Sequence, residues 1–119
     1  MCDIMATKQK YMAIILDNGM KSIIAENVDI PQAVKKLRTR MGKYMWIDEI
    51  CGYVIPQGVL KQRDDGVPYG WVGSLYVAKY DSNKKPVFAY TVRKKGQSLD
   101  KVSHDFIVKA DGTMLKGKW

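Results

Sequence analysis

Two short strings near the C-terminus contain residue types that enzymes use. Ser103, His104 and Asp105 are the three types of a serine hydrolase relay. Neighbouring residues of a strand point to opposite faces of a sheet, so these three cannot form that relay with one another. The segment from Gly112 to Lys118 matches the G-x-x-x-x-G-K pattern of phosphate-binding loops, but Trp119 stands where the pattern needs a Ser or Thr for Mg²⁺. Neither string predicts catalysis.

Metal and thiol chemistry have little support in the sequence. His104, Cys2 and Cys51 are not spaced as zinc ligands, and a structural zinc site normally needs four ligands. The adjacent carboxylates Asp48-Glu49 and Asp64-Asp65 are typical of solvated loops. The fold could still bring Cys51 and His104 together, but a Cys in an apolar stretch is more often part of the core. We therefore predict no catalytic residue, no metal and no cofactor.

Cations gather in one segment that contains no acid. Five of them fall within nine residues, namely Lys35, Lys36, Arg38, Arg40 and Lys43. At about 100° per residue, Lys36, Arg40 and Lys43 line one solvent face of a helix, with the other two beside it. Such a face is either simply solvated, with cations that suit the negative end of the helix dipole, or it binds phosphate groups. We take Lys36, Arg40 and Lys43 as candidate phosphate ligands.

A second set of candidates combines cations with large rings. Arg93, Lys94 and Lys95 follow an aromatic strand, and Tyr69 and Trp71 lie among glycines and a proline. Rings beside flexible glycines are common in ligand loops, where they stack on bases while cations hold phosphates. The alternative is that the rings belong to a β core. We predict phosphate contacts from the three cations and stacking from the two rings.

A hairpin and one helix begin the chain. Residues 10–16 and 22–28 are rich in strand formers and flank Asn18-Gly19, which favours a tight turn. A helix is predicted over residues 30–41, because apolar residues recur at its period. Asp29 can cap it, with Gln32 completing a capping box. Gly42 is placed to end it in a left-handed conformation.

The remaining elements predict a fold of the α+β class. Further strands are expected within 44–55, at 71–80 and 86–95, and in a hairpin of 104–110 with 113–118 around Asp111-Gly112. On the strand 86–95, Phe88, Tyr90 and Val92 should share one face and Arg93 the other. We expect a mainly antiparallel, curled or barrel-like sheet, in the order ββα then about five strands, with the amphipathic helix packed on it.

Length and composition favour one globular domain. The 119 residues form a single expected domain, 1–119, with residues 1–8 as a flexible leader. Hydrophobic residues make up 46%, which argues against disorder. The longest clean apolar run, Met12 to Leu16, is far too short to span a bilayer, so no membrane partner is expected. With two cysteines the chain lacks a disulfide framework, which favours a cytoplasmic location.

The net charge suggests the kind of partner. Twenty Lys and Arg against twelve Asp and Glu give +8, which attracts nucleic acid, phosphate-bearing ligands or acidic protein surfaces. We predict a non-catalytic basic binding module for nucleic acid or a nucleotide-type ligand. The first alternative is a protein-interaction or inhibitor module that covers a macromolecular partner, including self-association through strand edges. An enzyme with residues 56–70 as a lid is the second alternative.

Overall fold

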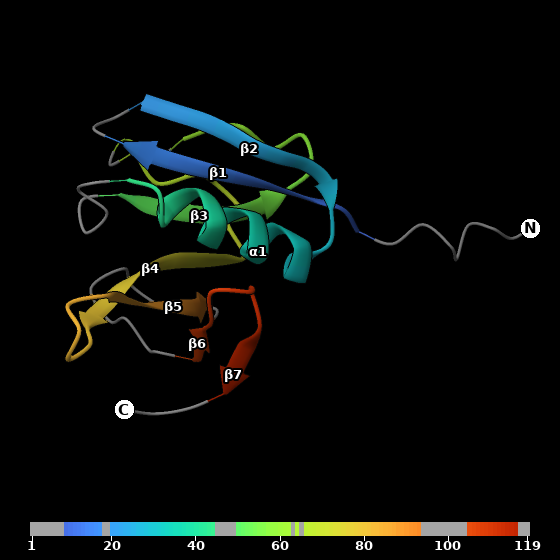
Figure 1. The fold of residues 1–119 in the computed structure, drawn as a ribbon. Coiled ribbons are helices and arrows are strands. Elements are labelled where there is room, and N and C mark those ends of the chain that lie inside the picture. Colours follow the sequence, from blue (N-terminus) through green and yellow to red (C-terminus); the bar gives the residue numbers. More distant parts are fainter. Residues whose placement is uncertain are drawn as a thin grey trace, which may run out of the picture.

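A computed structural model describes residues 9–17, 20–44, 50–62, 64, 66–93 and 105–116, so the expected leader lies outside the described residues. Within these ranges one antiparallel sheet runs in the order β2-β1-β3-β4-β5-β6-β7 (Figure 1). Its strands are β1 (Tyr11–Asp17), β2 (Met20–Val28), β3 (Cys51–Pro56), β4 (Gly73–Tyr80), β5 (Pro86–Val92), β6 (Phe106–Val108) and β7 (Met114–Lys116). Helix α1 (Ile30–Met41) lies across one face of the sheet.

The sheet is open rather than closed. The predicted α+β class, the antiparallel pairing and the order ββα then strands are confirmed. A barrel is not formed, because β2 and β7 stand at opposite ends of the strand order. Closure would require these two edges to pair along their length, and β2 has nine residues whereas β7 has three.

Local signals in the sequence determine where α1 begins and which face it buries. The Asp29 carboxylate accepts the backbone N–H of Gln32 at 2.8 Å, and the Gln32 amide oxygen accepts the backbone N–H of Asp29 at 3.3 Å. This is the predicted capping box. The buried residues are Ala33, Val34, Leu37 and Met41. Helix α1 is the one helix within the described ranges. With twelve residues, several of them charged, it is too short and too polar to cross a bilayer.

The predicted left-handed end of the helix is wrong. Gly42 has a φ of −64° and a ψ of −11°, which is right-handed backbone. The chain instead tightens, since Lys43 and Tyr44 donate their backbone N–H groups to Arg40 and Met41, three residues back, each at 3.1 Å. A Cβ at position 42 would lie 2.8 Å from a guanidinium nitrogen of Arg38. This nitrogen is the far end of a flexible side chain, so a residue with a Cβ could displace it, and the backbone does not require a positive φ here.

Two apolar clusters bury the two faces of the central strands. On the helix side, Gly52 of β3 faces α1, and a Cβ there would lie 3.0 Å from the sulfur of Met41. On the opposite side, the segment between β3 and β4 places Val67 and Trp71 against the sheet. They pack on Met12, Ile14, Tyr53 and Ile55. Val67 and Trp71 thus anchor this segment on the core, whereas Leu60 and Tyr69, which belong to the predicted lid, are exposed.

Candidate functional site

An open groove of about 460 Å³ runs along the outer face of α1, beside β2. Its lining consists of Lys35, Lys36, Arg40, Lys43, Gln32, Thr39 and Ile24, the last from β2. We call this surface the basic groove. The predicted phosphate ligands Lys36, Arg40 and Lys43 are therefore brought together on one surface, and Lys35 joins them.

The periodicity of α1 positions these side chains. Leu37 and Met41 are fully buried against the sheet, so residues about half a turn away must point to solvent. Gln32 and Thr39 share the groove because they lie three or four residues from the cations. Neither residue was predicted as a ligand, although the same helical spacing could have placed both in the site.

The charged side chains that line the basic groove are all positive. It is lined by four cations and by no Asp or Glu of the part of the chain that the structure describes. None of the four forms an ion pair with a described residue. Clustered, unpaired cations create a positive potential that attracts anions. The groove is therefore a surface of positive potential on the described part of the chain.

Arg38 lies outside the basic groove, although it belongs to the same cluster in the sequence. Its guanidinium carbon stands 4.2 Å from the centroid of the Phe88 ring on β5. Its Nε is buried and has no hydrogen-bond partner among the residues that the structure describes. Burial lowers the pKa of Arg38. This cation therefore packs on an aromatic ring instead of facing a ligand from the groove.

The second predicted set, the cations after β5 with the rings of Tyr69 and Trp71, is brought together only in part. The guanidinium of Arg93 lies over the ring of Trp71, with 5.4 Å between its carbon and the ring centroid, and its Nη1 donates to the Trp71 carbonyl oxygen at 3.4 Å. Trp71 is 5% exposed and meets Tyr53 edge-on, whereas Tyr69 is 51% exposed. Stacking of a base on Trp71 would therefore require Arg93 to move. Lys94 and Lys95 lie outside the described residues.

The two sets do not converge on one short ligand. The basic groove follows α1, which covers one face of the sheet. Trp71 packs in the cluster on the opposite face. Phosphate contacts at Lys36 and Arg40 and ring contacts at Trp71 therefore belong to separate surfaces.

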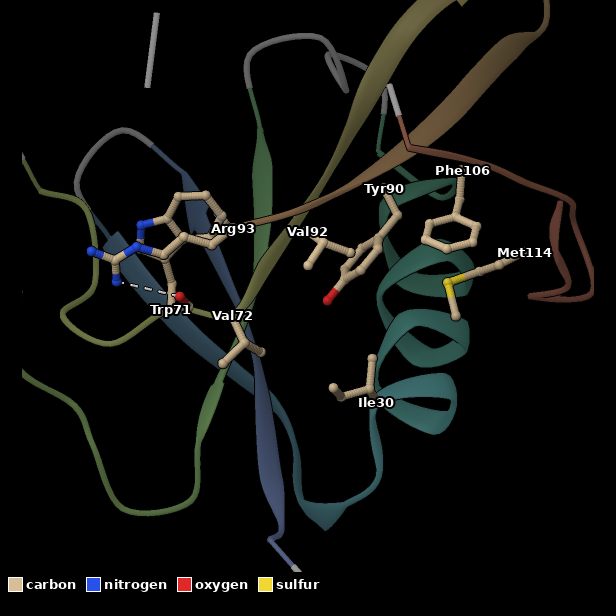
Figure 2. A pocket seen from close by; sticks show the side chains of 8 residues that line it. All are labelled: Ile30, Trp71, Val72, Tyr90, Val92, Arg93, Phe106 and Met114. Atoms are coloured by element: carbon tan, nitrogen blue, oxygen red, sulfur yellow. Dashed lines mark hydrogen bonds between the residues drawn. The ribbon is translucent and has the colours of Figure 1, made fainter. Parts of the chain in front are cut away.

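A second cavity, of about 630 Å³, opens between the first turn of α1 and strands β5 to β7. Figure 2 shows Trp71 and Arg93 at one end, and Tyr90, Phe106 and Met114 at the other. Tyr90 is buried, and this burial raises the pKa of its phenol. The alternation along β5 predicted that Tyr90 and Val92 share a face. That this face lines a cavity depends on β6 and β7, and no local signal could reveal it.

The residues that could support catalysis or metal binding are mostly not described. Ser103, His104, Asp48, Glu49, Asp65 and Lys118 lie outside the described ranges. Among the residues inside them, no three His, Cys, Asp or Glu side chains gather as a metal site would require. Asp105 accepts the backbone N–H of Val92 at 2.8 Å. Burial raises the pKa of the free thiol of Cys51.

No protein-family model matches this chain, and comparisons with curated proteins and with solved structures find no similar protein. The basic groove of α1, with its four unpaired cations, is therefore the candidate site on its own geometry.

Proposed function

We propose that this protein is a non-catalytic cytoplasmic module that binds the phosphate backbone of nucleic acid through the basic groove. The observation that carries the proposal is the groove's lining of four cations, without an acid from the described residues. All four side chains are exposed, so they can reach a ligand without rearrangement of the core. The net charge of +8 adds long-range attraction for the same partner.

The length of the basic groove fits a linear polyanion. A helix rises about 1.5 Å per residue, so Lys35 and Arg40 are about 7.5 Å apart along the axis of α1, and Lys43 follows just beyond its end. Phosphates of one DNA strand repeat about every 3.4 Å, and the helical part of the groove therefore faces roughly two to three of them. No aromatic side chain lines the groove, so it offers no platform on which a base can stack. Contacts to phosphates alone carry no sequence information, and binding should be independent of sequence.

The salt dependence of binding tests this proposal. We expect the anisotropy of a labelled oligonucleotide to give a log–log slope of affinity against salt of about −3 to −4, because about four bound cations release counterions. The double variant Lys36→Gln/Arg40→Gln should make the slope shallower by roughly 2. Its affinity at low salt should fall for every oligonucleotide sequence.

A matched control separates the groove from the overall charge. Lys10 and Lys61 are exposed and do not line the groove. The variant Lys10→Gln/Lys61→Gln loses the same charge and should keep the slope of the unmodified protein. Equal losses of affinity and equal changes of the salt slope in both double variants would show that net charge alone drives binding. No binding at low salt would reject the proposal outright.

The exposed edge of β2 favours a second candidate function, an interaction module that pairs with another strand. β2 is nine residues long and stands at the end of the sheet. Two large apolar side chains on it are exposed, Met20 at 75% and Ile23 at 47%. A long edge with apolar side chains is a template for pairing with a further strand. A self-associated species or a stable complex in light scattering at high salt, abolished by Ile23→Lys, would support this function.

A further inference from the structure

The cavity at the first turn of α1 has walls that suit an apolar ligand. Five apolar side chains from four elements and the chain before β4 line it, namely Ile30, Val72, Val92, Phe106 and Met114. Figure 2 shows Val72 and Val92 on one side of Tyr90, Phe106 and Met114 on the other, and Ile30 of α1 beside them. The cavity volume of about 630 Å³ lies within the range of roughly 300–1,000 Å³ that is usual for small-molecule pockets. We call this cavity the apolar pocket.

One end of the apolar pocket carries a positive charge. Arg93 is exposed, and Figure 2 shows its guanidinium beside Trp71, with Val72 and Val92 between it and Tyr90. The bond from Nη1 to the Trp71 carbonyl oxygen and the contact with the Trp71 ring fix its orientation. Its other N–H groups have no acceptor among the described residues. A guanidinium with free donors matches a carboxylate, which it can bind through two parallel hydrogen bonds.

The other distinctive group is a hydrogen-bond donor inside the apolar walls. Tyr90 is 2% exposed, and its hydroxyl makes no hydrogen bond with any residue in the described ranges. Figure 2 shows this oxygen directed into the space between Val92, Val72 and Ile30. Among the described residues the buried side-chain atom without a partner is Arg38 Nε, so the Tyr90 hydroxyl oxygen is itself open to the pocket. It can therefore donate a hydrogen bond to an oxygen of a ligand in this space.

We propose that the apolar pocket binds a small amphipathic carboxylate whose apolar body carries a carbonyl oxygen. The body lies against the five apolar side chains, the carboxylate pairs with Arg93, and the carbonyl oxygen accepts from the Tyr90 hydroxyl. A neutral apolar molecule would leave Arg93 unpaired, and a polyanion would find no further cation in the walls. The site is separate from the basic groove and does not depend on nucleic-acid binding.

Three probes separate these contacts. 4-Benzoylbenzoate has a carboxylate and a ketone, benzophenone lacks the carboxylate, and 4-benzylbenzoate lacks the ketone. Each is titrated into the full chain carrying ¹³C-labelled Ile, Val and Met methyl groups. For 4-benzoylbenzoate we expect saturable shifts at Ile30, Val92 and Met114, with a Kd of roughly 10 µM to 1 mM. Shifts that do not saturate, or that are as large at Ile23 on β2 as in the pocket, overturn the site.

The Arg93→Gln variant tests the carboxylate contact. It should lower the affinity for 4-benzoylbenzoate roughly tenfold or more and keep the affinity for benzophenone within about twofold of the unmodified protein. Lys109→Gln removes an equal charge in the turn between β6 and β7, outside the pocket lining, and should change neither probe. Equal losses in the two variants would overturn the role of Arg93.

The Tyr90→Phe variant removes the hydroxyl and keeps the ring. We expect it to weaken 4-benzoylbenzoate by roughly three- to tenfold and to leave 4-benzylbenzoate unchanged. Unchanged methyl shifts outside the pocket confirm that the variant is folded. A variant that binds both carboxylates as tightly as the unmodified protein overturns the role of Tyr90.

Discussion

The hydroxyl end of the Tyr90 ring lies directly against the backbone of Gly73 on the neighbouring strand. A Cβ at position 73 would overlap the hydroxyl oxygen and the ring carbon that carries it. Gly73 does not have a positive φ, so glycine is needed here for space alone. Leu75, two residues along β4, is the register partner of Tyr90. The pairing therefore gives the ring little freedom to move away.

We expect Gly73→Ala to lower the free energy of unfolding by about 1–3 kcal/mol, because the added methyl group overpacks a buried site. Urea titration measures the change. Tyr90→Leu provides the control, since the shorter side chain leaves space above position 73. In that background the same substitution should cost clearly less. An equal cost in both backgrounds would show that Tyr90 is not the residue that requires glycine.

Arg38 offers a prediction of the opposite sign. Its buried Nε lacks a partner among the described residues, and its guanidinium stacks on the ring of Phe88. Arg38→Met removes the unsatisfied donor and keeps an unbranched side chain on the ring, so we expect unfolding free energy to stay equal or to rise by up to about 1 kcal/mol. Arg38→Ala is the control and should destabilise, because it also removes the packing. A loss of more than about 1 kcal/mol in Arg38→Met would mean that the cation–π contact outweighs the unpaired donor.

Features set by neighbouring residues could be predicted from the sequence. The helix bounds follow from the capping box of Asp29 and Gln32 and from the apolar period, which are all local. The end of the helix could not be predicted in the same way. A glycine after the last apolar residue often adopts a left-handed conformation, but Gly42 stays right-handed, and Lys43 and Tyr44 bond to carbonyl groups three residues back. Glycine is compatible with both endings, so the residue type does not decide between them.

The candidate site was likewise predictable only where it depends on residues that are close in the sequence. Lys36, Arg40 and Lys43 share a face because the helical period is fixed, so their grouping was predictable. Trp71 was expected beside them in function, yet it packs under the opposite face of the sheet. Alternation along a strand says which residues share a face, but it does not say which face the helix covers. The apolar pocket forms only where β5, β6 and β7 meet the first turn of α1. It could not be predicted, because alternation along one strand does not show which other elements lie beside it.

The turn between β6 and β7 should weaken in acid. The Asp111 carboxylate accepts the backbone N–H of Thr113 at 2.9 Å, and this bond lowers the pKa of Asp111 below its ordinary value of 3.8. A lowered pKa in the folded state adds stability above pH 3.8 that is lost as the pH falls through the folded value. Asp111→Asn should remove this dependence. Urea unfolding at pH 6 and at about pH 3 measures it, and the unmodified protein should lose more stability than the variant. Equal losses would show that the bond is not formed by the charged carboxylate.

Cys51 should be a poorly reactive thiol whose ionisation opposes folding. Burial raises the pKa of Cys51, and its contact with Tyr53 lowers it by a smaller amount. Because the thiolate is the reactive form, iodoacetamide at pH 8 should alkylate the folded protein at least about tenfold more slowly than the urea-unfolded protein.

The Cys2→Ser variant leaves Cys51 as the one remaining thiol for this measurement. A raised pKa in the folded state adds stability that is complete below the unfolded thiol's pKa of about 8.5 and is lost as the pH rises through the folded value. Cys51→Ser, which does not ionise, should therefore lose less stability than its parent between pH 8 and about pH 10. Equal alkylation rates in the folded and unfolded states would contradict the burial on which both expectations depend.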